Sequence, residues 1–246
     1  MFQGYTNEAI EFLMALKFNN NREFFLANRD VYERTLRAPT LALAQLLQPA
    51  VQAIDPLLET RPQKVVSRIN RDIRFSKDKS PYRDHIWIGY RRPSVVKGTT
   101  LGVYVYLDTD SAGYGMGYYA ENRPVMNALR RQILTAPEHV SELTNAALKQ
   151  FQLVPTFRKR PQTPDDVPEN LRTWYALKCF YIEKPITDTA LLFSPALADE
   201  VVRGFGELKP FYRFLTELVP ESDDYGGTNE RTKHENRSTM KEGYDA

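Results

Sequence analysis

The sequence is poor in the residues on which several common catalytic chemistries depend. Its 246 residues include one cysteine, Cys179, and three histidines. A single cysteine cannot form a disulfide within the chain, and the apolar residues around it favour core packing over reactivity. A zinc site or a cysteine–histidine nucleophile would have few residues to draw on. We therefore predict no metal and no cofactor.

Long apolar runs and familiar functional motifs are also absent. No segment approaches the roughly 18 to 20 apolar residues of a membrane-spanning helix, and the N-terminus lacks a signal-peptide pattern. The chain has no G-x-x-x-x-G-K-[ST] loop and no G-x-S-x-G elbow, and Gly113-Tyr-Gly-Met-Gly117 lacks the spacing of a dinucleotide fingerprint. These absences predict a cytoplasmic protein with no membrane partner, and they leave open whether it is an enzyme.

The apolar content, 42% of residues, is sufficient for a substantial core. Apolar residues at helical spacing predict helices near residues 9–31, 41–58, 124–134, 137–148 and 195–218. Alternating patterns predict strands at 86–90, 103–108, 114–119 and 179–183, the second and third joined as a hairpin by turn residues 108–113. We expect a single α+β domain over residues 1–221, with an antiparallel or mixed sheet packed against several helices.

Local breaks in these patterns lead to further expectations. Asn20, followed by Glu23, resembles a capping box at the start of the second helix. Pro49 is expected to break or kink one helix, and the last helical segment is expected to be either one helix or a pair divided at Pro210. Residues 155–168 are expected to form a loop. Residues 222–246 contain no Leu, Ile, Val or Phe, which predicts a disordered tail.

The most informative feature is a local concentration of positive charge. Residues 61–83 contain eight basic and two acidic residues, a formal charge of +6, whereas the rest of the chain carries −4. The centre of this segment is the basic motif, Arg68-Ile-Asn-Arg-Asp-Ile-Arg-Phe-Ser-Lys-Asp-Lys-Ser-Pro-Tyr82. Arginine forks and lysine point charges are the groups that recognise phosphate and carboxylate.

The basic motif divides into two parts. If residues 70–74 are extended, Asn70, Asp72 and Arg74 share one face, whereas Ser76–Pro81 is rich in turn residues and is expected to form a loop. Asp72 and Asp78 are candidates for orienting the arginines or for proton transfer. A solvated loop with surface ion pairs is the simpler interpretation, but Phe75 and Tyr82 could anchor the loop.

Three glycines, Gly113, Gly115 and Gly117, recur at a spacing of two on a predicted strand. They would leave one face of that strand bare, which permits close approach of a ligand or of another backbone. A bend or a bulge is the alternative explanation.

The pairing of Asn20-x-Arg22-Glu-Phe-Phe25 with the basic motif resembles the family called domain of unknown function 2461. The resemblance runs to about Val219 and includes the glycine-rich strand and Arg158-Lys-Arg-Pro161. It implies an α+β domain of bacterial or fungal type, and it implies no activity, cofactor or partner.

Three hypotheses follow for the basic motif. The first is a site, catalytic or not, for a small anionic ligand bearing phosphate or carboxylate. The second is a buried polar network that ties helices to the sheet in a domain that binds a protein partner. The third is a nucleic-acid-binding module, which we rank last because the chain outside the motif is net negative. The candidate ligand contacts are Arg22, Arg68, Asn70, Arg71, Arg74, Lys77, Lys79, Tyr82 and Arg160.

Overall fold

The computed structural model describes residues 1–74, 77–93 and 99–218. Its strands are β1 (Ile86–Arg91), β2 (Leu101–Leu107), β3 (Ala112–Tyr118), β4 (Gln152–Phe157) and β5 (Leu177–Pro185). Its helices are α1 (Asn7–Phe18), α2 (Arg22–Ala27), α3 (Arg29–Val31), the π-helix η1 (Tyr32–Arg37), α4 (Ala38–Ile54), α5 (Pro62–Val65), α6 (Arg123–Thr135), α7 (Pro137–Leu148), α8 (Glu169–Ala176), α9 (Thr189–Leu192) and α10 (Ala196–Glu217). The predicted tail, residues 222–246, and the predicted anchor Phe75 lie outside the described residues.

The strands form one antiparallel sheet in the order β1-β2-β3-β5-β4. This confirms the α+β prediction and the hairpin of β2 and β3, whose turn is closed by a 2.7 Å hydrogen bond from the Asp108 amide to the Ser111 carbonyl. The side chain of Lys17 on α1 reaches this turn and lies 3.2 Å from the Asp110 carboxylate. Helix α1 is thereby attached to the end of the hairpin.

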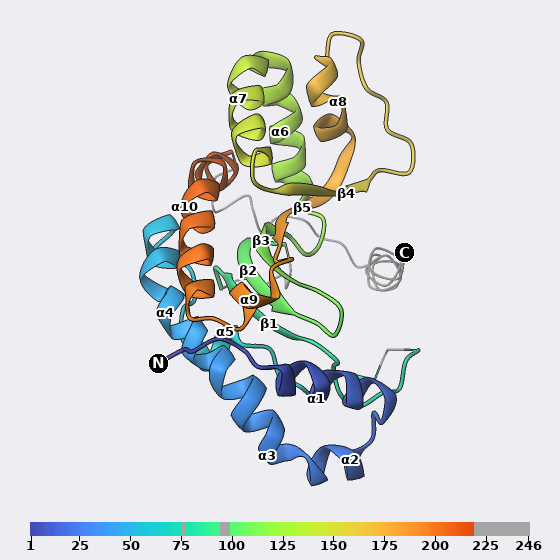
Figure 1. Ribbon diagram of the computed structural model, residues 1–246. Helices are drawn as coiled ribbons and strands as arrows, with labels where there is room; N and C mark the ends of the chain where they lie inside the picture. The colour runs from blue at the N-terminus through green and yellow to red at the C-terminus, as the bar shows by residue number, and fades with distance from the viewer. Residues whose placement is uncertain (75–76, 94–98, 219–246) are drawn as a thin grey trace.

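One face of the sheet packs against α4 and α10, which lie side by side along it (Figure 1). The Tyr90 hydroxyl on β1 donates to the Ala44 carbonyl of α4 at 2.9 Å. Helix α10 approaches β3 so closely that a Cβ on Gly204 would lie 2.3 Å from the Tyr114 ring. The main core therefore lies between this face and the two helices.

A buried carboxylate, Asp55, joins α4 to α10 at one end of this core. It accepts a hydrogen bond from the Tyr212 hydroxyl at 2.9 Å and one from Arg92 Nε at 2.6 Å. Burial alone raises the pKa of Asp55, but the bonds from Arg92, the Leu57 amide and Tyr212 outweigh it and hold the pKa below its usual value. The carboxylate therefore stays charged and paired in the interior.

The glycines of β3 are explained by close approach of neighbouring groups. A Cβ on Gly115 would lie 2.0 Å from a carbonyl oxygen of β5. On Gly113 it would meet the Tyr106 ring at 2.8 Å, and on Gly117 the Tyr181 ring at 2.6 Å. The face left bare by the glycines is thus covered by aromatic rings and by another backbone.

Three prolines mark where the observed elements differ from the sequence patterns. Pro155 lies in β4, which replaces the start of the predicted loop; β4 is an edge strand, where the missing N–H of proline is tolerated. Helices α4 and α10 continue through Pro49 and Pro210, so the chain is not broken at Pro49, and α10 is the single helix of the two alternatives rather than a pair divided at Pro210. Packing of an apolar stripe outweighs the loss of one backbone hydrogen bond.

Replacing Gly115 by alanine should separate β3 from β5 and lower the free energy of unfolding by about 3 kcal/mol. Gly206, within α10, is the matched control, because its Cβ would meet nothing within 4 Å. Gly206→Ala should raise the free energy of unfolding by about 0.5 to 1 kcal/mol through helix propensity. Urea unfolding of both variants checks this, and equal effects would contradict the account of the glycine spacing.

Candidate functional site

The basic motif folds back on itself just before β1. Asn70 pairs with Tyr82 in an antiparallel bridge. The Arg71 amide donates to the Pro81 carbonyl, and the Arg83 amide to the Ile69 carbonyl, each at 2.8 Å. Residues 71–73 are not part of a strand, so the extended piece predicted for residues 70–74 is limited to this bridge.

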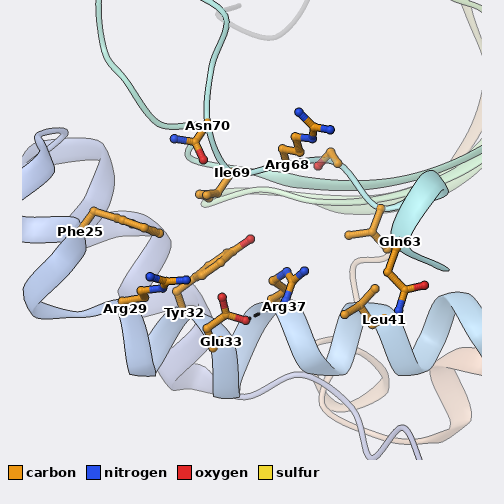
Figure 2. Close-up of a pocket in the computed structure, with 12 residues that line it drawn as sticks. Phe25, Arg29, Tyr32, Glu33, Arg37, Leu41, Gln63, Arg68, Ile69 and Asn70 are labelled. Atoms are coloured by element: carbon orange, nitrogen blue, oxygen red, sulfur yellow. Dashed lines mark hydrogen bonds and ion pairs between the residues drawn. The ribbon is translucent and has the colours of Figure 1, made fainter.

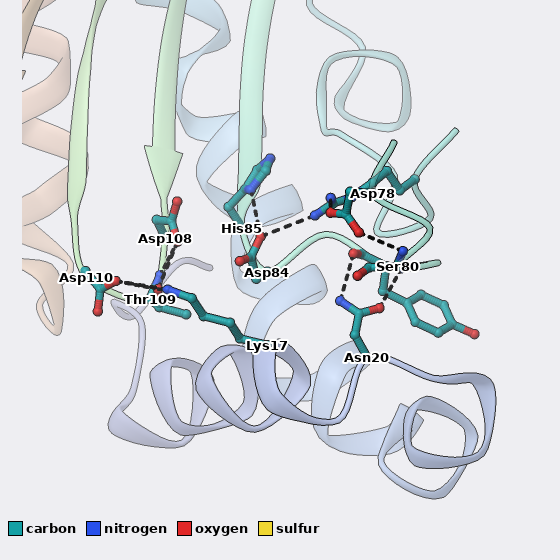
Figure 3. A network of polar contacts seen from close by, with 11 residues as sticks. Lys17, Asn20, Asp78, Ser80, Asp84, His85, Asp108, Thr109 and Asp110 are labelled. Atoms are coloured by element: carbon teal, nitrogen blue, oxygen red, sulfur yellow. Dashed lines mark hydrogen bonds and ion pairs between the residues drawn. The ribbon is translucent and has the colours of Figure 1, made fainter. Parts of the chain in front are cut away.

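Asn20 attaches the folded motif to the N-terminal helices. Its side-chain amide donates to the Tyr82 carbonyl at 3.0 Å and accepts from the Tyr82 amide at 2.9 Å (Figure 3). The Tyr82 ring stacks on Phe25 of α2 with centroids 4.3 Å apart. The prediction that Asn20 caps α2 was wrong: Asn21 is the cap and accepts from the Phe24 amide at 2.9 Å. Asn20 is therefore available for the tertiary contact.

Charges in the inner part of the motif neutralise one another. Arg71, whose side chain is 20% exposed, forms an ion pair with Asp78 and lies 3.7 Å from Asp84. Asp78 also accepts from the Ser80 amide at 2.9 Å. His85 Nδ1 lies 3.3 Å from the Asp84 carboxylate, and this hydrogen bond, aided by the charge of Arg71, lowers the pKa of Asp84 to about 2 against the opposing effect of burial. These contacts are of the kind expected for a structural polar network.

The outer residues of the motif point to solvent. Arg74, 76% exposed, folds onto Asp72 with Nε and Oδ1 2.9 Å apart. Lys79 donates to the Ile73 carbonyl at 3.0 Å, and Lys77 is exposed. The predicted cluster of Asn70, Asp72 and Arg74 is thus limited to the contact between Asp72 and Arg74.

Two further predicted ligand contacts, Arg22 and Arg160, belong to other segments of the chain. Arg22 is exposed at the start of α2. Arg160 is exposed on the segment that joins β4 to α8, at the opposite end of the molecule from α1 and α2 (Figure 1). The candidate ligand contacts therefore do not form a single cluster.

A cleft of about 460 Å³ brings part of the basic motif close to the N-terminal helices. Figure 2 shows Arg68, Ile69 and Asn70 on one wall and Arg29, Tyr32, Glu33 and Arg37 on the helical wall. Small-molecule sites in proteins have volumes in this range. The cleft is therefore the candidate site.

The helical wall includes the π-helix η1, in which the Ala38 amide donates to the Glu33 carbonyl five residues earlier. π-helical turns are rare and occur frequently at functional sites. The sequence patterns did not predict that this part of the chain lines a site, because Arg29 and Arg37 have the pattern of ordinary solvated charges on a helix. No signal in the sequence distinguishes a π-turn from an α-turn here.

The cleft is positively charged, with three arginines and one carboxylate. Arg37 Nη1 donates to Glu33 at 3.0 Å, so this acid is already paired. Within the described part of the chain, the side chains of Arg29 and Arg68, both exposed, make no hydrogen bond and no ion pair. Two guanidinium groups on opposite walls are therefore available to a ligand.

Tyr32 lies between the arginines in the floor of the cleft. The residue is 4% exposed, and its hydroxyl has no hydrogen-bond partner among the residues described. Figure 2 shows this hydroxyl pointing into the cleft. Burial raises the pKa of Tyr32 to about 12, although the charge of Arg37 opposes the rise, so the hydroxyl is protonated at neutral pH.

The described residues include neither a membrane-spanning helix nor a cluster of metal-binding side chains. None of the helices within residues 1–74, 77–93 and 99–218 has the length and apolar character needed to cross a membrane. The same residues contain no group of three or more His, Cys, Asp or Glu side chains arranged to hold a metal ion.

Comparison with known proteins finds one family. The model of the family described as "Conserved hypothetical protein (DUF2461)" matches residues 8–214, which run from the second residue of α1 through most of α10. No curated protein matches the chain.

Replacing Asn20 by alanine should release the motif from the helices. The variant loses both side-chain bonds to Tyr82, and we expect the free energy of unfolding to fall by about 2 kcal/mol in urea titrations. Asn19→Ala is the control, since the one side-chain bond of Asn19 to a described residue is a local, exposed bond to the Ala15 carbonyl. A loss no larger than that of the control would contradict the role assigned to Asn20.

The Asp84 carboxylate should contribute to the loss of folding stability at acid pH. Its pKa in the folded protein lies below the value of about 3.9 for an unfolded aspartate, so its stabilisation is complete above about pH 4 and is lost as the pH falls toward 2. Unfolding measured across this range should show the wild type losing about 1 to 2 kcal/mol more than Asp84→Asn. Parallel pH profiles would show that the Asp84 contacts do not stabilise the fold.

Proposed function

Because the chain belongs to the family of conserved hypothetical proteins DUF2461, whose description carries no activity, we propose a function from the geometry of the cleft. The protein binds a small anionic ligand, bearing phosphate or carboxylate, between η1 and residues 63–70. Arg29, Arg68 and the Tyr32 hydroxyl are the principal contacts, with Arg37 beside them.

One observation carries this proposal: three side-chain donors on facing walls of one cleft have no partner among the residues that the structure describes. Arg29 and Arg68 make no ion pair among the described residues, and the hydroxyl of the buried Tyr32 points into the same space. Donors of this kind can bond to an incoming anion without first giving up a bond within the protein. An anion in the cleft would satisfy all three.

The basic motif then has two roles. Arg68 and Asn70 line the cleft, whereas Arg71 and Asp78 pair with each other and hold the motif in its folded form. The structural network and the anion site are thus compatible parts of one arrangement. Neither Asp72 nor Asp78 lines the cleft, and proton transfer by either stays a prediction, as does a cytoplasmic location.

Replacing Arg68 or Arg29 by glutamine should weaken binding of sulfate and of phenyl phosphate by about tenfold at low ionic strength, because one charge-assisted hydrogen bond is lost. Isothermal titration calorimetry gives the affinity. Arg74→Gln is the matched control: Arg74 belongs to the same motif, is exposed and lies on Asp72 rather than in the cleft.

If Arg74→Gln weakens binding as much as Arg68→Gln does, the anions bind to the exposed loop and the proposed site is wrong. If wild-type protein binds none of the anions tested, the proposed function itself is wrong.

A further inference from the structure

We propose that the cleft selects an oxyanion that carries two negative charges and no proton, as in the dianion of a phosphate monoester. This inference rests on the proposed function and specifies its ligand class. A carboxylate, or a phosphate monoester that has gained a proton, should bind more weakly.

The first argument is the charge of the lining. Arg29, Arg37 and Arg68 together with Glu33 give a formal charge of +2. A dianion neutralises this charge, whereas a carboxylate leaves one positive charge uncompensated in a partly enclosed space. Charges at such close range interact more strongly than they do in bulk water.

The second argument is the excess of hydrogen-bond donors over acceptors in the lining. Guanidinium groups only donate, and the Tyr32 hydroxyl, with its pKa of about 12, keeps its proton and can donate it. The Glu33 carboxylate is bonded to Arg37, and the Ser67 hydroxyl oxygen already accepts from the Trp87 amide at 3.0 Å. The amide oxygens of Gln63 and Asn70 also line the cleft and can accept, but the three guanidinium groups and the Tyr32 hydroxyl supply more donors than the lining supplies acceptors. The lining therefore favours ligand oxygens without protons.

The third argument is the volume of the cleft and its apolar lining. The cleft, at about 460 Å³, is large enough for more than a lone tetrahedral anion. Phe25, Leu41, Val66 and Ile69 add apolar surface to its lining. An ester with an apolar or aromatic group therefore fits the lining better than inorganic phosphate does.

Three probes test this selectivity: phenyl phosphate, benzoate and sulfate. Phenyl phosphate and benzoate have the same ring but differ in charge, and sulfate keeps two charges and no proton throughout the range used. Affinities are measured by calorimetry at constant ionic strength between about pH 5 and about pH 8, which spans the second pKa of a phosphate monoester, about 6.

At pH 8 phenyl phosphate should bind at least about tenfold more tightly than benzoate. Its affinity should fall about tenfold toward pH 5, as the dianion gains a proton. Sulfate reports any titration of the groups that face the cleft, namely Tyr32, Glu33 and the three arginines, and its affinity should change much less.

Tyr32→Phe isolates the hydroxyl without altering the packed ring. Since the hydroxyl has no partner among the described residues, the variant should unfold at the same temperature as the wild type. It should bind phenyl phosphate about fivefold more weakly. Arg74→Gln again serves as the control with wild-type affinity.

The outcomes separate the two claims. If phenyl phosphate and benzoate bind equally, if the affinity for phenyl phosphate does not change with pH, or if Tyr32→Phe binds like the wild type, the selectivity is wrong while anion binding stands. If none of the three probes binds, the proposed function is wrong as well.

Discussion

The contact between Asn20 and Tyr82 is the constraint on which the candidate site depends. One side chain satisfies both the amide and the carbonyl of Tyr82, and the Phe25 ring stacks on the Tyr82 ring. Because Tyr82 is paired with Asn70, fixing it also fixes the segment that carries Arg68. The two walls of the cleft are therefore held at a defined separation by a contact outside the cleft itself.

The two principal hypotheses for the basic motif describe different parts of it. Toward the interior, Arg71 is neutralised by Asp78 and lies near Asp84, so its charge is used within the protein. Toward the helices, Arg68 has no such partner among the described residues. A run of like charges can thus stabilise its own fold and still present a net positive surface to a ligand.

The sequence was sufficient to predict most elements of the fold, because apolar periodicity reports directly which face of a helix or strand is buried. It failed at β4, where Pro155 was read as a loop residue although an edge strand tolerates it. For the site, composition located the motif but could not show that Arg71 pairs with Asp78, whereas the Arg68 side chain has no partner in the part of the chain that the structure describes. Arg29 and Tyr32 were missed because their role depends on a tertiary contact and on a π-turn, neither of which has a local pattern.

The most direct test of the central claim is a crystal structure of the protein with phenyl phosphate bound. We predict the phosphate in the cleft, within hydrogen-bond distance of the Tyr32 hydroxyl and of Arg29 or Arg68, with η1 unchanged. Phosphate bound instead at Arg74 and Lys79 on the exposed part of the motif, with an empty cleft, would contradict the account.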